Sequence, residues 1–139
     1  GPNGIDVSPD GQWFLVAGYA SQSVIRLSRG QTPVQIDRVG VGFNIDNVHW
    51  APDGTLLAAG HSAPTRGRVG ECIARRTCEG IVSHVARVDT ETMTARSIFR
   101  YPTNSALILG TTAIEVDNEL WVGQVAGGTR MARVPLPTQ

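Results

Sequence analysis

The sequence contains no lysine, few aromatic residues and no long hydrophobic run. All twelve basic residues are arginines, and twelve acidic residues balance them, so the formal net charge is zero. A neutral surface gives no reason to expect a nucleic acid or an anionic membrane as a partner. No apolar run approaches the ~18 residues that would cross a membrane. The length of 139 residues suits one compact domain with its own core.

Cysteine is also scarce, because Cys72 and Cys78 are the only two in the sequence. They lie in the loop-like segment 66–80, and no histidine stands near them at a spacing typical of zinc sites, which argues against a zinc motif. We expect a disulfide between them, with two free thiols as the alternative. A disulfide would indicate an oxidising compartment and would therefore favour a periplasmic or secreted location.

A convincing helical period is absent as well, and a repeat of strand-like patterns takes its place. Three segments alternate apolar and polar residues and then reach an Asp-Gly or Asp-Asn turn, namely 4–11, 47–54 and 112–119. This pattern is typical of a strand that enters a hairpin. A second apolar run follows each of them, at 13–17, 56–59 and 120–122, and glycine or alanine stands at the end of each run or directly after it. Small residues at these ends allow a close approach of the backbone.

The repeat continues with further alternating segments and a measurable period. Third strands are predicted at 23–27, 82–88 and 131–134, and fourth strands at 34–39 and 95–99. The interval from Pro9 to Pro52 is 43 residues, within the ~40–45 residues of a four-stranded propeller blade. The interval from Asp53 to Asp117 is 64 residues, and the excess of 21 falls in the Gly- and Arg-rich segment 62–81.

These patterns predict an all-β chain that forms part of a β-propeller. We divide the domain 1–139 into a blade at 1–40, a blade at 41–104 with a loop insertion at 62–81, and a blade at 105–139 that lacks its outer strand. Because propellers have about four to eight blades, these three would be about half of a six-bladed ring. The alternative is a β-sandwich of eleven short strands, which explains the alternation but not the repeat.

The propeller topology gathers polar residues at one end of the central channel, which we call the mouth. Inner strands start there and second strands end there. The inner strands contribute Asn3, Asn44, Asp46, Asn47, Thr111 and Thr112, and the second strands contribute Tyr19, His61 and Gln124. Carboxylate and amide oxygens from different blades favour a site for a hard cation such as calcium. The imidazole of His61 would suit proton transfer at this rim.

Each of these residues also has a purely structural interpretation. Asn3 could serve as a turn residue, and Asp46 with Asn47 could cap a turn between blades. His61 could be a structural histidine. No Gly-x-Ser-x-Gly motif is present, so a serine hydrolase has no support. We expect turn roles at the opposite face for the acidic residues of the two Pro-Asp-Gly sequences, Asp10 and Asp53.

Four segments together resemble a known family. They are Pro2-Asn3-Gly4-Ile5 running into Ser8-Pro9-Asp10-Gly11, then Phe43-Asn44-Ile45-Asp46-Asn47, then 56–61 ending in Gly60-His61, and finally 109–113 with 119–123. In this order and spacing they resemble the paraoxonase/arylesterase and gluconolactonase-like (regucalcin-like) calcium-dependent six-bladed propellers. The resemblance covers nearly the whole chain.

The resemblance implies a calcium-dependent hydrolase of lactones or aryl esters, of which this chain would be the C-terminal half. Asn3, Asp46 and Asn47 would bind the catalytic calcium, or another divalent cation in its place, and His61 would lie over the substrate pocket. The family's other calcium ligands and its closing strand come from N-terminal blades. We therefore expect the chain alone to be inactive, and its partner to be the missing N-terminal half or a second copy in a homodimer. A non-catalytic propeller that binds a protein or ligand at the mouth is the alternative.

Overall fold

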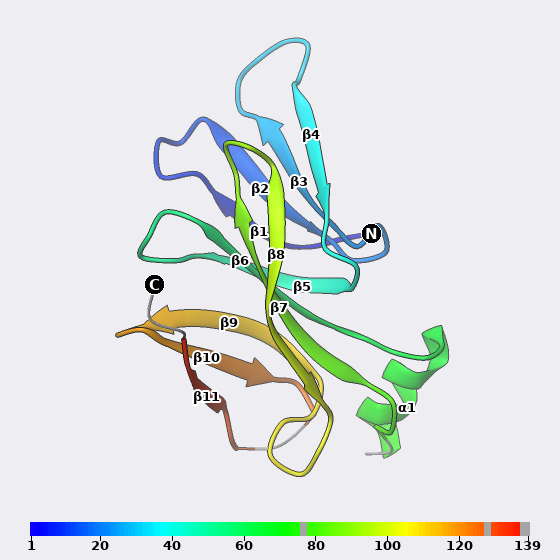
Figure 1. Cartoon of the computed structure of the whole chain (residues 1–139). Coiled ribbons are helices and arrows are strands. Elements are labelled where there is room, and N and C mark those ends of the chain that lie inside the picture. Colours follow the sequence, from blue (N-terminus) through cyan, green and yellow to red (C-terminus); the bar gives the residue numbers. More distant parts are fainter. Residues whose placement is uncertain (76–77, 127–128, 137–139) are drawn as a thin grey trace.

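The computed structural model describes residues 1–75, 78–126 and 129–136. Its strands form three antiparallel sheets, each made of strands that follow one another in the sequence, and we call these sheets blades 1 to 3 (Figure 1). Blade 1 contains β1 (Pro2–Val7), β2 (Trp13–Gly18), β3 (Ser23–Ser28) and β4 (Ile36–Gly40). Blade 2 contains β5 (Asn44–Trp50), β6 (Leu56–Ser62), β7 (Val82–Asp89) and β8 (Thr94–Pro102). Blade 3 contains β9 (Gly110–Val116), β10 (Glu119–Gln124) and β11 (Ala132–Pro135).

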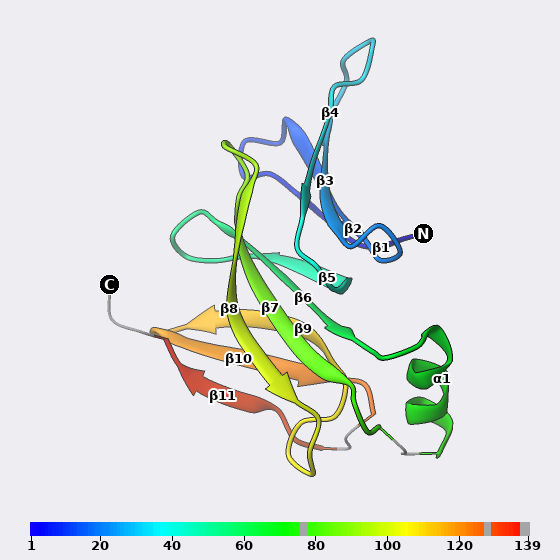
Figure 2. The ribbon, with the colours of Figure 1, turned by 45° about the vertical axis from the view of Figure 1, so that its right-hand side comes forward.

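Blade 2 lies between the other two blades, as both Figure 1 and Figure 2 show. Three separate sheets of four, four and three strands confirm the predicted partial β-propeller and exclude a two-sheet sandwich. The described part of blade 3 has no fourth strand, as the sequence predicts for this blade.

The hairpin turns follow the chemistry that the sequence repeat indicates. Gly11 and Gly54 close the first two inner hairpins with φ angles of 71° and 80°, a conformation that glycine adopts without steric cost. In blade 3 the turn residues Asp117 and Asn118 take the left-handed region themselves, with φ angles of 50° and 63°. Asp and Asn tolerate this region better than most other residues, so the third repeat makes its tight turn without the glycine that the first two use.

Two hydrophobic cores hold the blades together, one at each junction. Between blades 1 and 2 the second strands bring Leu15 and Ala17 against Leu56 and Ala58. Between blades 2 and 3 the core contains, among others, Leu57, Ala59, Val85, Phe99, Ala113, Leu120 and Val122. Leu56 and Leu57 are adjacent in β6 and point to opposite cores, which is the period-two pattern of a strand buried on both sides. The six buried residues of β6 reflect this position.

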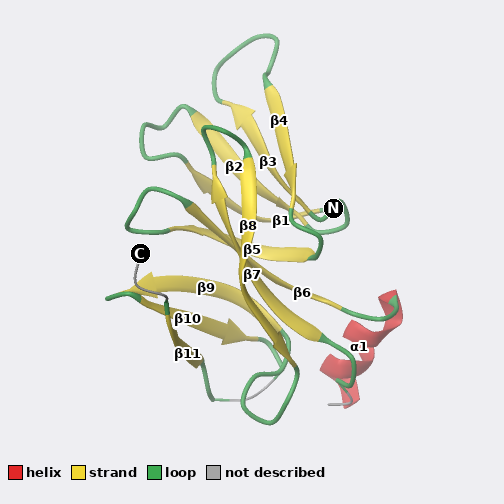
Figure 3. Ribbon diagram, in the orientation of Figure 1, coloured by secondary structure: helices red, strands yellow, loops and turns green. Residues whose placement is uncertain are grey.

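The insertion after β6 differs from the expected loop, because residues Arg66–Arg75 form the helix α1 (Figure 3, red). Gly67 and Gly70 lower its helix propensity and conceal the helical pattern. The helix depends instead on packing of Val69 and Cys72 against Ile81 and Leu109. Cys72 is bridged to Cys78 with an S–S distance of 2.02 Å, which confirms the expected disulfide. No helix among the described residues is long and apolar enough to cross a membrane.

Candidate functional site

The mouth is marked by a β-bulge at the same place in all three inner strands. In β1, Asn3 and Gly4 together oppose a single residue of β2. In β5, Asp46 is the extra residue between two paired neighbours, and Thr111 is the extra residue in β9. Asn3, Asp46 and Thr111 occupy equivalent positions of the sequence repeat. A bulge changes the direction in which a side chain points, and bulges are frequent beside active sites. The three equivalent residues therefore lie outside the regular strand pairing.

Two glycines allow the backbones at the mouth to approach one another. A Cβ atom on Gly60 would lie 1.9 Å from the carbonyl oxygen of Asn44. A Cβ atom on Gly4 would lie 2.8 Å from both the Asp46 carbonyl oxygen and the Asn47 Cα, so β1 is pressed against β5. No side chain fits at either position, as expected for close backbone contact. The result is that Asn3 of blade 1 reaches Asp46 of blade 2.

Four side chains form a connected polar network, which we call the mouth network. The amide nitrogen of Asn3 donates a hydrogen bond to Oδ1 of Asp46. The other oxygen of that carboxyl, Oδ2, lies 3.8 Å from Nδ1 of His61. The Nε2 atom of His61 lies 2.8 Å from the hydroxyl oxygen of Tyr19. The network therefore crosses twice between blades 1 and 2.

The electrostatics of the mouth network disfavour its charged forms. His61 is only 2% exposed; burial lowers its pKa, and the opposing effect of Asp46 is smaller. Burial raises the pKa of Asp46 despite the nearby His61 and the hydrogen bond from Asn3. Burial, together with the charge of Asp46, also raises the pKa of Tyr19. Nδ1 of His61 is enclosed and makes no hydrogen bond of ordinary length and angle with the described residues, although the backbone of Gly110, like Asp46, acts to raise the pKa of His61.

Asn47 and Asn44 flank the network and are held by their amide nitrogens. Asn47 donates to the carbonyl oxygen of Thr111 in blade 3, at 3.0 Å. Asn44 donates to the carbonyl oxygen of Tyr19 in blade 1, at 2.8 Å. A Cβ atom on Gly4 would lie 3.2 Å from Oδ1 of Asn47, so this amide oxygen faces β1. Three inner strands thus contribute to one small region.

The oxygen atoms of this region are of the types that bind hard cations, but the side chains supply fewer of them than calcium takes. No three His, Cys, Asp or Glu side chains gather as a metal site anywhere in the described residues. Any cation would therefore rely on the Asp46 carboxylate with the amide oxygens of Asn3 and Asn47. These are the donor types that calcium prefers, but calcium takes about six to eight oxygens.

The remaining predicted mouth residues, Thr111, Thr112 and Gln124, do not join the mouth network through their side chains. Thr111 takes part through its carbonyl group, whereas the hydroxyl of Thr112 lies 3.0 Å from Nε2 of His49. Gln124 accepts a hydrogen bond from the backbone of Ile108 at 2.6 Å and donates to the carbonyl oxygen of Arg130 at 2.7 Å. Its side chain therefore braces the loops of blade 3.

Sequence reasoning missed one buried residue that supports the mouth. Ser83 in β7 is fully buried, and its hydroxyl oxygen accepts a hydrogen bond of 2.8 Å from the backbone nitrogen of Gly110. This bond fixes the start of β9, just before the Thr111 bulge. Ser83 pairs with His61 in the β6–β7 ladder. A lone serine in a strand pattern carries no signal of this role.

The helix α1 and its disulfide lie beside the mouth. β6 ends one residue after His61 and leads towards α1, and both views place α1 on the same side of the molecule as the N-terminus (Figures 1 and 2). Cys72 and Cys78 pack with Leu109, the residue that precedes β9. Leu109 has a positive φ of 59°, which is unusual for a residue with a branched side chain and is tolerated when packing fixes it.

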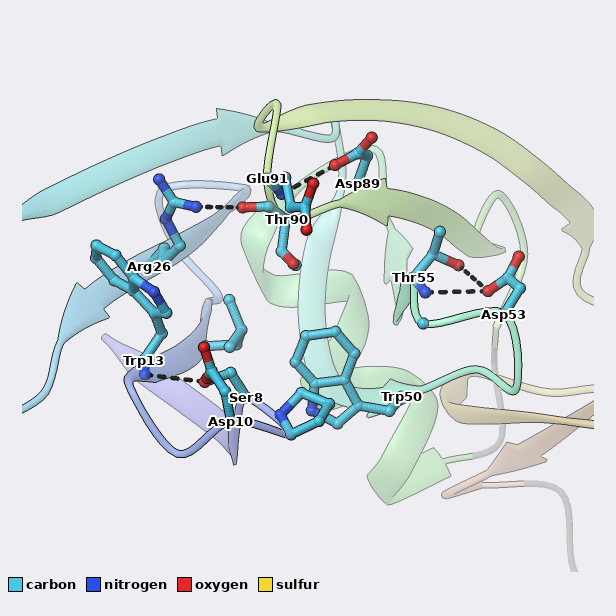
Figure 4. A pocket seen from close by; sticks show the side chains of 13 residues that line it. Ser8, Asp10, Trp13, Arg26, Trp50, Asp53, Thr55, Asp89, Thr90 and Glu91 are labelled. Carbon is cyan, nitrogen blue, oxygen red and sulfur yellow. Dashed lines mark hydrogen bonds between the residues drawn. The ribbon is translucent and has the colours of Figure 1, made fainter.

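An open cavity of about 550 Å³ lies between blades 1 and 2 at the opposite face. Figure 4 shows its side chains, including Trp13, Trp50, Arg26, Asp10 and Asp53. Asp10 accepts hydrogen bonds from Ser8 and from the backbone of Gln12. Asp53 accepts from the backbone and the hydroxyl of Thr55. These are turn contacts at the face opposite the mouth, where the sequence places both aspartates.

Comparisons with known proteins give the fold and no family assignment. No family model matches the chain, and no curated protein matches it. A crystal structure of a protein of unknown function from Bacteroides caccae superposes with a TM-score of 0.57 at 14% identity, over 94% of this chain and 44% of that one. Virginiamycin B lyase from Staphylococcus aureus superposes with a TM-score of 0.57 at 13% identity, over 99% of this chain and 42% of that one. The chain thus spans less than half of these solved structures, and the likeness shows a propeller-like fold alone.

Proposed function

We propose that the mouth of this chain is part of a calcium-dependent active site that hydrolyses a lactone or an aryl ester. The observation that supports the proposal most strongly is the mouth network, in which a half-buried carboxylate with a raised pKa joins Asn3 of the neighbouring blade and faces a buried histidine. The sequence resemblance to the paraoxonase and gluconolactonase-like propellers supports the same assignment. Both arguments select the same residues.

The chain's own residues would hold the cation and position the substrate. Asp46 would bind through its carboxylate, with the amide oxygens of Asn3 and Asn47 beside it. When bound, calcium would polarise the ester carbonyl and stabilise the negative charge that develops on its oxygen. The ionised form of Asp46 faces Nδ1 of His61, so the tautomer with the proton on Nδ1 is favoured. Nε2 then accepts the hydrogen bond from the hydroxyl of Tyr19.

Calorimetric titration of the chain with calcium tests the metal site. We expect binding that Asp46→Ala abolishes, because the substitution removes the only carboxylate of the set. Asp37→Asn is the matched control, since it removes a carboxylate that pairs with Arg26 on the outer strand of blade 1. Equal affinity in the wild type and in Asp46→Ala would contradict the site.

A hydrolysis assay in a protein that contains the complete ring tests the reaction. His61→Gln is expected to lower hydrolysis of an aryl acetate or a γ-lactone at least tenfold, a threshold set below the ~10²–10⁴ typical of an acid–base residue. Calcium affinity should hardly change, because His61 is not a proposed ligand. Full activity in this variant would leave His61 with a structural role.

A non-catalytic binding module is the second candidate, and the burial of His61 favours it. With 2% exposure, and with Nε2 occupied by Tyr19, the imidazole does not itself reach a ligand in the mouth. Calcium binding without any hydrolysis in the complete ring would select this candidate. The Cys72–Cys78 disulfide further supports an oxidising, extracytoplasmic location for either function.

A further inference from the structure

The junction between blades 1 and 2 contains an open cavity, whereas an arginine side chain joins the blades at the equivalent place between blades 2 and 3. The strand registers identify the equivalent residues. Leu15 of β2 and Leu57 of β6 each face the following blade. Leu15 pairs with Arg26 of β3, and Leu57 pairs with Arg87 of β7. Arg26 and Arg87 therefore occupy the same position in their blades, each at the junction with the next blade.

Between blades 2 and 3, the side chain of Arg87 points inward. Its guanidinium binds Asp53 in the inner turn of its own blade at 2.6 Å, and it also binds Glu115 of blade 3. The residue that pairs with Arg87 on the outer strand is Arg96. Because like charges on paired positions repel each other, Arg96 favours the inward direction of Arg87.

Between blades 1 and 2, the side chain of Arg26 points outward. Its neighbour on the outer strand is Asp37, and the guanidinium pairs with this carboxylate at 2.6 Å. The guanidinium also donates to the carbonyl oxygen of Thr90 in blade 2 and lies over the ring of Trp13, 4.3 Å from its centroid. Figure 4 shows it turned to Thr90, apart from Asp10. The opposite charge at the outer position explains why Arg26 does not occupy the inside of the junction.

Asp10 is the carboxylate that lacks the arginine of the next junction. It is equivalent to Asp53, because both stand in a Pro-Asp-Gly turn between the first two strands of their blade. The hydroxyl of Ser8 and the backbone of Gln12 donate to Asp10 and hold its pKa below its usual range. Its carboxylate is therefore ionised at neutral pH. It borders the cavity and makes no ion pair among the described residues.

Trp50 provides a second wall of the cavity. It pairs with Leu56 in the β5–β6 hairpin. Glu115 pairs with Leu120 in the β9–β10 hairpin, and both leucines face the preceding blade. Trp50 thus stands where the next junction has its second carboxylate, and the face of an indole also attracts cations. Its indole nitrogen donates to the carbonyl oxygen of Val7 at 2.8 Å, which fixes the ring between the two blades.

The turn between β7 and β8 adds two further carboxylates, Asp89 and Glu91, to the lining of the cavity. Hydrogen bonds from the backbones of Thr92 and Glu91 lower the pKa of Asp89. Arg26 is the one base among the described residues that line the cavity, and Asp37 neutralises it. The volume of about 550 Å³ is within the range of small-molecule sites. All of these lining residues belong to blades 1 and 2, and each of these blades has four strands.

We propose that this cavity binds a small organic cation that carries a guanidinium group, in the position that the guanidinium of Arg87 has at the next junction. The bound cation would form an ion pair with Asp10 and lie against the ring of Trp50. A guanidinium suits both contacts, because its flat face stacks on an aromatic ring while its edge donates two hydrogen bonds to a carboxylate. The cavity lies at the face opposite the mouth, so this inference goes beyond the proposed function and is independent of calcium.

An NMR titration of the 139-residue chain with N-butylguanidinium, in the presence of a chelator, tests the proposal. The indole N–H signals distinguish the three tryptophans, because Trp13 and Trp50 line the cavity and Trp121 lies in blade 3. We expect a saturable shift of the Trp50 signal and no saturable shift of the Trp121 signal. N-butylurea is the matched neutral ligand of nearly the same shape, and it should bind at least about tenfold more weakly. Equal binding of the two ligands would contradict the proposal.

Asp10→Asn removes the charge that the proposal assigns to the ligand. The amide oxygen can still accept the hydrogen bonds from Ser8 and Gln12, so we expect the turn to keep its structure. The affinity for N-butylguanidinium should fall at least about tenfold. Asp117→Asn is the matched control, because Asp117 is the exposed aspartate of the equivalent turn in blade 3, and it should bind the probe as the wild type does.

Asp37→Arg tests why the cavity is open. It recreates on blade 1 the pair of arginines that blade 2 has on its outer strands, so Arg26 should turn inward to Asp10 and exclude the probe. Asp37 does not line the cavity among the described residues, so loss of binding in this variant would support the proposed position of the cation. Wild-type affinity in Asp37→Arg or in Asp10→Asn would contradict the proposal, and so would a wild type without saturable binding.

Discussion

The two ends of the β5–β6 hairpin each carry an aspartate, and the protein surrounds them in opposite ways. At the turn, partial burial tends to raise the pKa of Asp53, but hydrogen bonds from Thr55 and the charge of Arg87 outweigh it and lower the pKa. At the mouth, burial dominates and raises the pKa of Asp46. One carboxylate is therefore stabilised in its charged form and the other is not.

The partners explain this difference. Arg87 is 7% exposed, and its guanidinium donates to Asp53 at 2.6 Å, to Thr55 at 2.9 Å and to Glu115 of blade 3. Asp46 has one hydrogen bond from Asn3 and a histidine nitrogen at 3.8 Å. An ion cluster in which Arg87 binds two carboxylates joins two blades, whereas an underbonded carboxylate in a site of perturbed pKa values is typical of a functional centre. The same hairpin thus carries a structural end at Asp53 and the candidate functional end at Asp46.

The largest effect on stability is expected from the removal of Arg87, which pairs with Asp53 at the turn of the hairpin. Arg87→Met should lower the free energy of unfolding by about 3–5 kcal/mol, because it leaves the carboxylates of Asp53 and Glu115 without their buried partner. Urea unfolding measures this loss. Arg96→Met, at an exposed arginine of β8, should change stability by less than about 0.5 kcal/mol. A loss below about 1 kcal/mol for Arg87→Met would show that the cluster is not structural.

Acid should lower the stability of the protein through His61, which is buried, and His84, which is partly exposed. Burial lowers the pKa of both His61 and His84, with Arg100 and His61 adding to the effect at His84. Below about pH 6.5 the unfolded chain binds protons that the native histidines do not, so the free energy of unfolding falls as the pH falls. The raised pKa of Asp46 acts in the opposite direction, because the native carboxyl takes up its proton first.

Urea unfolding between pH 7 and pH 5.5 checks this dependence. We expect a loss of roughly 1 kcal/mol per pH unit from His61, and less from the partly exposed His84. His61→Gln should flatten the curve more than His84→Gln. A stability that is constant over this range would contradict the buried neutral state of these histidines.

Removing the hydroxyl of Tyr19 should lower stability by less than the changes above, because it affects one hydrogen bond at the mouth. Tyr19→Phe should cost about 1 kcal/mol, because Nε2 of His61 loses its partner in a buried position. Tyr101→Phe is the matched control, since this exposed tyrosine accepts a hydrogen bond of 2.9 Å from Asn104. Thermal unfolding of both variants is the measurement. Equal shifts in the two variants would show that the hydroxyl of Tyr19 has no special role.

The sequence was sufficient to predict the strands and the order of the blades. Alternation and Asp-Gly turns specify strand position and hairpins, and equivalence within the repeat placed Asn3, Asp46 and His61 at one face. The bulges at Asn3 and Asp46 could not be predicted, because an extra residue in a ladder depends on the register of both strands. The helix α1 was missed because Gly67 and Gly70 conceal its pattern.

The ion pairs between residues far apart in the sequence could not be predicted. Arg87 is one of twelve arginines, and its partners Asp53 and Glu115 lie 34 and 28 residues away. Nothing local in the strand pattern selects it. Gln124 was expected to line the mouth, but loop backbones that fold over it take up its amide group. Such contacts form only when the blades and loops pack together, so the pattern of a single strand does not predict them.

The most direct test of the contrast between the two ends is a paired measurement of Asp46→Asn and Asp53→Asn by urea unfolding at pH 7. Each substitution replaces a carboxylate by an amide of nearly the same shape. Asp53→Asn should lower the free energy of unfolding by about 2 kcal/mol, because Arg87 loses a charged partner. Asp46→Asn should leave it unchanged or raise it, because the native state disfavours the ionised carboxyl at this position. An equal loss of stability in both variants would contradict the account, since Asp46 would then be a second structural ion pair.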